Sequence, residues 1–233
     1  MVENFWDQVE RVLLVRLRSI GDTVLTTPCL TALKEWRPDV EIDVLVESLS
    51  APVLRSHPQV DQLFVLPTIK GQVAKLQARL QIIRALRQRQ YDIAFNLHGG
   101  STAMFLTRLS GAKTTIGYKA GRYSKLLSLA APSPQEIWQK EEIHCVEQQL
   151  ALLKWSGVPI NNAPRLSLQV ATTTQEIIAK KLTQAGVKGD FVIIHPSAAF
   201  VSKQWETRRF VEVIEYLINL INCLVWSQLH RMK

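Results

Sequence analysis

Short apolar segments alternate with longer amphipathic ones along this chain, and this alternation constrains its fold more than any other feature. The apolar segments have strand length, whereas the segments between them carry apolar residues at helical spacing. Such alternation is typical of βαβ units, whose strands lie parallel in one sheet. We therefore predict an α/β protein with strands at 12–16, 42–46, 63–66, 93–97, 114–117 and 191–195, and helices at 24–36, 72–90, 102–109, 136–155, 174–185 and 207–221.

A polar, proline-containing segment at 159–171 interrupts this pattern, and a new α/β unit begins after it. We predict one lobe over residues 1–165 and a second over residues 172–233. The second lobe is shorter than the ~100–150 residues typical of a domain, and it offers at most one further strand, at 223–226. We expect a complete first lobe and a partial second one.

The net charge of +8 is unevenly distributed. Residues 62–135 contain eleven basic side chains and one acidic side chain, a net charge of +10, so the rest of the chain carries −2. A localised positive field favours an anionic partner such as a phosphorylated substrate, an anionic membrane face or a nucleic acid. Solvated helix faces are the alternative interpretation. Few aromatic residues are interleaved with the basic ones and no recognition motif is present, which disfavours nucleic acid.

Cysteine usage and the chain's ends indicate a compartment. Three cysteines without a CxxC pair are typical of a reduced, cytosolic protein. The first residues are acidic where a secretory signal is basic, and no apolar run approaches the ~20 residues that span a bilayer. His144 and Cys145 have no partners at the spacing of a zinc site, so we predict no metal site and no cofactor.

The motif Ser19-Ile20-Gly21-Asp22 follows the first predicted strand. Ligands of open α/β sheets bind beyond the carboxyl ends of the strands, where this loop is expected to lie. Gly21 permits backbone conformations that other residues avoid and lets a ligand approach, and Asp22 is a candidate general base. The alternative interpretation is that Asp22 and Thr23 cap the next helix. Neither a GxGxxG fingerprint nor a P-loop occurs in the chain.

Three other predicted strand ends carry candidate binding residues. Ser197 and Lys203 follow the strand at 191–195, near a helix start that favours anions. His98 precedes two glycines and is a candidate for an acceptor hydroxyl. Lys119 and Arg122 follow the strand at 114–117 and suit carboxylate or phosphate groups. For each loop, a plain surface loop is the alternative.

These motifs, in this order, resemble the ADP-heptose:lipopolysaccharide heptosyltransferases, glycosyltransferase family 9, which have the two-lobed GT-B fold. The resemblance extends to about Asn219. It rests on residues 12–22, 27–33, 58–61, 91–92, 97–109, 144–147, 195–197, 202–205 and 209–210.

The resemblance implies a GT-B protein with a complete N-terminal Rossmann-like lobe for the acceptor and a partial C-terminal lobe for the nucleotide sugar. It implies inverting, metal-independent transfer of heptose from ADP-heptose to the lipopolysaccharide inner core, at the cytoplasmic face of the inner membrane. Asp22 would be the general base. The donor-binding residues would be Gly21, Ser197 and Lys203, and the acceptor-binding residues Ser19, His98, Lys119 and Arg122.

The tail of the chain departs from the family pattern. The adenosine-binding strands and the D-[ST]-G-P-x-H segment expected after Lys203 are absent, and residues 220–233 do not resemble the expected continuation. We expect a truncated or frame-shifted product that retains the base and one phosphate contact, with impaired transfer. A non-catalytic module that binds an anionic glycolipid or membrane surface is the alternative function.

Overall fold

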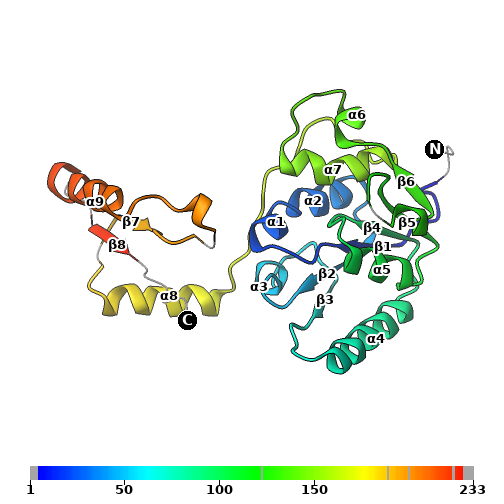
Figure 1. The fold of residues 1–233 in the computed structure, drawn as a ribbon, viewed down its shortest axis with the longest axis horizontal. Coiled ribbons are helices and arrows are strands. Elements are labelled where there is room, and N and C mark those ends of the chain that lie inside the picture. The colour runs from blue at the N-terminus through cyan, green and yellow to red at the C-terminus, as the bar shows by residue number, and fades with distance from the viewer. Residues whose placement is uncertain (1–4, 122, 188, 199, 222–223, 228–233) are drawn as a thin grey trace. The chain divides into compact units, whose positions relative to one another are not determined.

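Six parallel strands form the central sheet of a computed structural model that describes residues 5–121, 123–187, 189–198, 200–221 and 224–227 (Figure 1). The sheet order is β3-β2-β1-β4-β5-β6, so the order reverses between β1 and β4. This confirms the predicted α/β class with a parallel sheet. The strands are β1 (Arg11–Val15), β2 (Glu41–Glu47), β3 (Gln62–Leu66), β4 (Ile93–Asn96), β5 (Thr114–Tyr118) and β6 (Leu129–Ala131).

The central strand β1 is apolar because both of its faces are covered. Val12, Leu13, Leu14 and Val15 are fully buried. Successive side chains of a strand point to opposite faces, and accordingly Val12 and Leu14 belong to one hydrophobic cluster and Leu13 and Val15 to another. A run of apolar residues rather than an alternating one is what a parallel strand between two helix layers requires.

Helices cover both faces of the sheet (Figure 1). Buried residues of α2, α3 and α7 join the cluster that contains Val12, whereas those of α4 and α5 join the cluster that contains Leu13. The result is a three-layer unit. Its helices are α1 (Ile20–Val24), α2 (Thr27–Trp36), α3 (Ala51–Leu54), α4 (Gln72–Gln88), α5 (Ser101–Leu109), α6 (Pro134–Trp138) and α7 (Cys145–Trp155), with a 3₁₀ turn, η1 (Ser124–Leu126).

Two of the helices were predicted as continuous, but each is divided into two shorter helices in the structure. The helix expected at 24–36 begins earlier and is divided into α1 and α2. The helix expected at 136–155 is divided into α6 and α7, because Gln139 adopts a left-handed conformation with φ 54° that ends α6. His144 then caps α7, with its ring Nδ1 accepting the Val146 N–H and Glu147 completing a capping box. His144 therefore has a structural role in the fold.

A second compact unit begins at Val170, and the first ends at Gln169. It contains α8 (Thr172–Gln184), β7 (Phe191–Ile194), the 3₁₀ turn η2 (Val201–Lys203), α9 (Thr207–Ile221) and β8 (Leu224–Ser227). β7 and β8 form a parallel pair. In the part of the chain that the structure describes, no helix combines the length and the apolar character needed to cross a membrane.

Candidate active site

The carboxyl ends of β1 and β4 bring together the first group of predicted site residues. These strands are parallel neighbours, with Val15 paired to Asn96, and the sheet order reverses between them. Such a switch point is where open α/β sheets bind ligands. Arg16 bridges it, because its Nη1 donates a hydrogen bond of 2.6 Å to the carbonyl of Leu97.

Asp22 receives three donors on one carboxylate oxygen. Its Oδ2 lies 2.8 Å from Nη2 of Arg16, 3.0 Å from the backbone N of Ser19 and 3.1 Å from the Ser19 hydroxyl. Among the described residues, these contacts all go to Oδ2 and none to Oδ1. The Asp22 side chain is 37% exposed. One carboxylate oxygen is therefore held in place, and the other is open to a ligand.

The same contacts keep Asp22 ionised. Partial burial favours the neutral acid, but the Ser19 N–H, the Arg16 charge and the hydrogen bonds from the Arg16 and Ser19 side chains outweigh it, so the pKa of Asp22 is below its ordinary value. An ionised carboxylate with one open oxygen can accept a proton from a hydroxyl group. The sequence analysis did not select Arg16; its signal is a cation directly after a buried strand.

Local backbone structure corrects two expectations about this motif. Asp22 is the third residue of α1 rather than a loop residue, and Ser19 is the helix cap, so the expected Asp22–Thr23 cap pair is wrong. Gly21 lies within α1 and is not among the positive-φ glycines. A Cβ on Gly21 would meet nothing within 4 Å. The backbone beside the carboxylate is thus open, although no unusual conformation requires glycine there.

His98 lies on the other side of the switch point. Its Nδ1 and the Nε of Arg16 are buried without a hydrogen-bond partner among the described residues. Burial is the main cause of a lowered pKa for His98, and the Arg16 and Arg18 charges add to it, so the ring is neutral at neutral pH. A neutral imidazole can accept or donate one hydrogen bond at each nitrogen. The described part of the site thus brings Ser19, Asp22 and His98 to one edge of the sheet.

Gln149 of α7 is a further residue that the sequence analysis missed. It is 4% exposed, its Nε2 donates to the carbonyl of Asp22 at 3.3 Å, and its Oε1 accepts from the Thr26 hydroxyl. These bonds join α7 to the chain around α1. The signal in the sequence is an amide on the otherwise apolar buried face of a helix.

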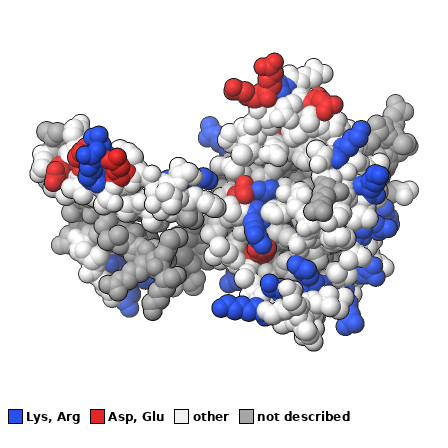
Figure 2. Space-filling model, viewed as in Figure 1, with Lys and Arg blue, Asp and Glu red and all other residues white. Residues whose placement is uncertain are grey.

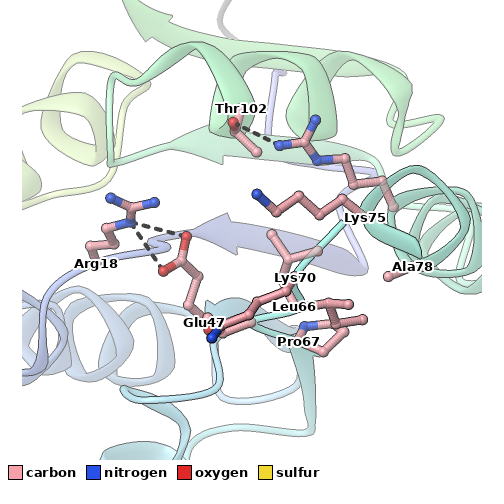
Figure 3. Close-up of a pocket in the computed structure, with 11 residues that line it drawn as sticks. Arg18, Glu47, Leu66, Pro67, Lys70, Lys75, Ala78 and Thr102 are labelled. Atoms are coloured by element: carbon pink, nitrogen blue, oxygen red, sulfur yellow. Dashed lines mark hydrogen bonds and ion pairs between the residues drawn. The ribbon is translucent and has the colours of Figure 1, made fainter. Parts of the chain in front are cut away.

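A basic pocket of about 380 Å³ lies beside the carboxyl ends of β2 and β3. Figure 3 shows Lys75 reaching into it from α4, opposite the pair formed by Arg18 and Glu47. Arg18 Nε donates to both Glu47 oxygens, at 3.1 and 3.0 Å, and Arg79 approaches the Thr102 hydroxyl at 3.5 Å. The pocket suits an anionic group, and the sequence analysis did not select its residues individually.

Lys119, another acceptor candidate, is not part of the Asp22 cluster. Lys119 is exposed after β5 and lines a different hollow, together with Ser133 and Glu136. Among the described residues it shares no hydrogen bond or ion pair with Asp22. Arg122 lies outside the described residues.

The second unit holds the other donor candidates in the segment between β7 and α9. The Ser197 hydroxyl lies 3.4 Å from Nε2 of His195, and Nζ of Lys203 lies 5.6 Å from the centre of the Phe200 ring. Lys203 is exposed and ends η2. The described residues of the whole chain contain no group of three or more His, Cys, Asp or Glu side chains arranged to hold a metal ion.

Comparison with models of protein families shows which family the chain resembles. The model of glycosyltransferase family 9 (heptosyltransferase) matches residues 79–232, which is more than half of the 233 residues. The chain belongs to glycosyltransferase family 9.

Curated relatives of this family 9 chain are heptosyltransferases. Lipopolysaccharide heptosyltransferase 3 of Escherichia coli K12 is 27% identical over 210 residues, which cover 86% of this chain and 58% of the relative. Lipooligosaccharide heptosyltransferase 2 of Haemophilus ducreyi is 25% identical over 219 residues, covering 89% and 60%. The family 9 chain thus spans about 60% of the length of these relatives.

Solved structures show the same fold. A family 9 glycosyltransferase from Veillonella parvula aligns with a TM-score of 0.81 at 19% identity, covering 94% of this chain and 62% of that one. An E. coli heptosyltransferase determined with ADP aligns with a TM-score of 0.67 at 21% identity, covering 95% and 67%. These likenesses confirm the predicted GT-B architecture of this family 9 chain.

Proposed function

We propose that this protein transfers heptose from ADP-heptose to the inner core of lipopolysaccharide, inverting the anomeric centre without a catalytic metal, and that this transfer is impaired because the chain spans only part of its relatives' length. Membership of family 9 supports the reaction class, and the curated relatives are lipopolysaccharide heptosyltransferases. Two related E. coli structures were determined with ADP and with ADP-2-deoxy-2-fluoro heptose, which supports the donor.

The observation that carries the proposal is the carboxylate of Asp22, fixed by Arg16 and Ser19 at the switch point with one oxygen open. In the proposed step, Asp22 takes the proton of the acceptor hydroxyl. The hydroxyl oxygen forms a bond to the anomeric carbon while the bond from that carbon to the ADP phosphate oxygen breaks, and ADP leaves with the electron pair. A lowered pKa keeps the base ionised before the step.

The remaining site residues are assigned to the two substrates according to the lobe in which they lie. Residues 1–165 would bind the acceptor through Ser19, His98, Lys119 and Arg122, and residues 172–233 would bind the nucleotide sugar. Ser197 and Lys203 would hold the diphosphate and stabilise the leaving ADP, with Gly21 leaving room for the donor. The protein would act in the cytoplasm, in peripheral contact with the inner face of the inner membrane.

Titration calorimetry with ADP, with circular dichroism as a check of folding, is the first test. Because the chain spans only about 60% of the length of its relatives, we expect ADP to bind weakly, and Lys203→Ala to abolish that binding by removing the charge that would hold the diphosphate. A folded chain without affinity for ADP would contradict the donor site in this chain.

A turnover assay then tests the base. With ADP-heptose and heptose-deficient lipopolysaccharide, we expect Asp22→Asn to slow ADP release by about 10²–10⁴-fold. Asp61→Asn is the matched control, because Asp61 is equally exposed at 38% and is also paired with a cation, Lys34, at 3.1 Å. Unchanged turnover in Asp22→Asn would refute the assignment.

The second candidate function is a non-catalytic module that binds an anionic glycolipid. The net charge of +10 over residues 62–135 and the basic pocket favour it. Binding of lipopolysaccharide without affinity for ADP would select this function over transfer.

A further inference from the structure

The helix α4 exposes an apolar stripe on the side away from the sheet. Val73, Leu76 and Leu80 are 72%, 58% and 46% exposed. Their spacing of three and then four residues places them on one helix face. On the opposite side of the helix, Ala78 and Leu86 are buried. The helix thus has an inner apolar face packed in the fold and an outer apolar face directed at solvent.

The surroundings of the stripe are basic. The 17 residues of α4 contain four basic side chains and no acidic one. Arg84 continues the stripe one turn after Leu80 and is exposed, and Arg87 follows three residues later on the same side and is also exposed. Figure 2 shows Lys and Arg side chains gathered over the part of the first unit where Figure 1 places α4, whereas acidic side chains gather near α6.

Charge and size together select the partner. From Val73 to Leu80 the stripe spans eight residues and is only about 10 Å long. Three side chains along such a length cover far less than the roughly 800 Å² that each partner of a stable protein interface buries. Two copies of this helix would also bring like charges together. An anionic bilayer fits both properties, because apolar side chains enter the boundary between headgroups and acyl chains while Lys and Arg meet the lipid phosphates.

We propose that the outer face of α4, defined by Val73, Leu76, Leu80 and Arg84, docks on the surface of an anionic lipid bilayer. The proposal gives a surface to the membrane contact, and in this it rests on the proposed function. Lys75 and Arg79 of the same helix line the basic pocket and lie outside this docking face.

Co-sedimentation of the full chain with vesicles tests the docking. Vesicles of equal parts phosphatidylcholine and phosphatidylglycerol are compared with vesicles of phosphatidylcholine alone. We expect binding to the anionic vesicles, weakening as salt rises. Leu76→Gln with Leu80→Gln should lower the partition coefficient by about tenfold or more, and Arg84→Gln by about fivefold.

Matched controls come from α8. Ile177 and Ile178 are 54% and 48% exposed, so Ile177→Gln with Ile178→Gln removes the same kind of side chain elsewhere, and Lys180→Gln matches Arg84→Gln. We expect these controls to bind vesicles as the wild type does. Circular dichroism verifies that each variant is folded.

The proposal would be overturned if the chain did not bind anionic vesicles at low salt, or if the Leu76/Leu80 variant bound them as well as the wild type does. It would also be overturned if ultracentrifugation showed a dimer that the Leu76/Leu80 variant abolishes, because the face would then bind a second copy of the chain. ADP binding by the same variants should be unchanged, so a failure of docking is separable from a failure of the proposed transfer.

Discussion

At the scale of single residues, Arg16 organises the site. Its side chain is 13% exposed, and its guanidinium joins Leu97, the residue after β4, to Asp22 in the first turn of α1. Arginine suits this position, because its planar group presents several donors in a fixed geometry and stays charged. One side chain thus both orients the candidate base and favours its ionised form.

The depressed pKa of Asp22 predicts how its ion pair acts on stability. A carboxyl group whose pKa is lower in the folded state stabilises the protein above its unfolded pKa, and this contribution disappears as pH falls through the folded value. At neutral pH we expect Asp22→Asn to lower the free energy of unfolding by about 0.5–1 kcal/mol, as for partly exposed pairs. The difference from wild type should vanish in strong acid. Denaturant unfolding at a series of pH values measures it, and a difference that persists in acid would contradict the prediction.

The carboxyl carbon of Asp22 allows a direct check by NMR titration. We expect a midpoint below the ordinary value of 3.8 in the wild type and a higher midpoint in Arg16→Gln, which removes the charge that favours the carboxylate. Arg37→Gln is the control, because Arg37 pairs with Asp7 instead. Identical midpoints in the wild type and in Arg16→Gln would show that Arg16 does not lower the pKa of Asp22.

Two glycines near the site predict opposite responses to alanine. A Cβ on Gly100 would lie 2.9 Å from Cδ2 of His98, so Gly100→Ala must displace the His98 ring. We expect altered NMR shifts of that imidazole and a free energy of unfolding lower by about 1 kcal/mol.

In Gly21→Ala, the added Cβ has free space within a helix, so the free energy of unfolding should rise by about 0.4–1 kcal/mol. Unchanged His98 shifts in Gly100→Ala would show that the ring is free to move.

At the scale of elements, the break between α6 and α7 predicts a stabilising substitution. Gln139 ends α6 with φ 54°, a region in which glycine is favoured over other residues. We expect Gln139→Gly to raise the free energy of unfolding by roughly 0.5–1 kcal/mol. Gln148→Gly, at an exposed position within α7, should lower it by about 1 kcal/mol. Denaturant unfolding measures both changes in the free energy of unfolding. If both variants changed it in the same direction, the assigned end of α6 would be contradicted.

The elements also show what the sequence pattern can and cannot predict. Buried strands such as β1 and β4 were predictable, because a strand covered on both faces needs a continuous apolar run. The short edge strand β6 and the four-residue α3 were missed, since neither is long enough to show a period. The placement of Ser19, Asp22 and His98 at one edge of the sheet followed from the parallel topology. The contact of Gln149 with Asp22 did not, because it joins residues 127 positions apart and depends on how α7 packs.

At the scale of the whole molecule, burial is concentrated in the first unit. Both hydrophobic clusters are built from it, and Ile194 is the one described residue of the second unit among the buried hydrophobic ones. Because burial of apolar surface is the main favourable contribution to folding, we expect residues 1–169 to fold alone. Circular dichroism should show cooperative thermal unfolding of this fragment. Its failure to unfold cooperatively would mean that the first unit depends on the second.

The place where the first unit ends is testable in the same way. Residues 161–169 form no helix or strand, yet Ser167 is bonded to the first unit: its hydroxyl lies 2.8 Å from Nε2 of His57, and its N–H donates to the Thr27 hydroxyl at 3.1 Å. Burial lowers the pKa of His57, so the ring is neutral at neutral pH and able to share this bond.

We therefore expect a fragment of residues 1–160 to be less stable than residues 1–169 by about 1–3 kcal/mol, the sum of two hydrogen bonds. Ser167→Ala in the longer fragment should lose about half of that difference, because the backbone bond to Thr27 survives. Denaturant unfolding at neutral pH compares the three proteins. If the two fragments are equally stable, residues 161–169 contribute nothing to the first unit, and that unit ends by Ile160.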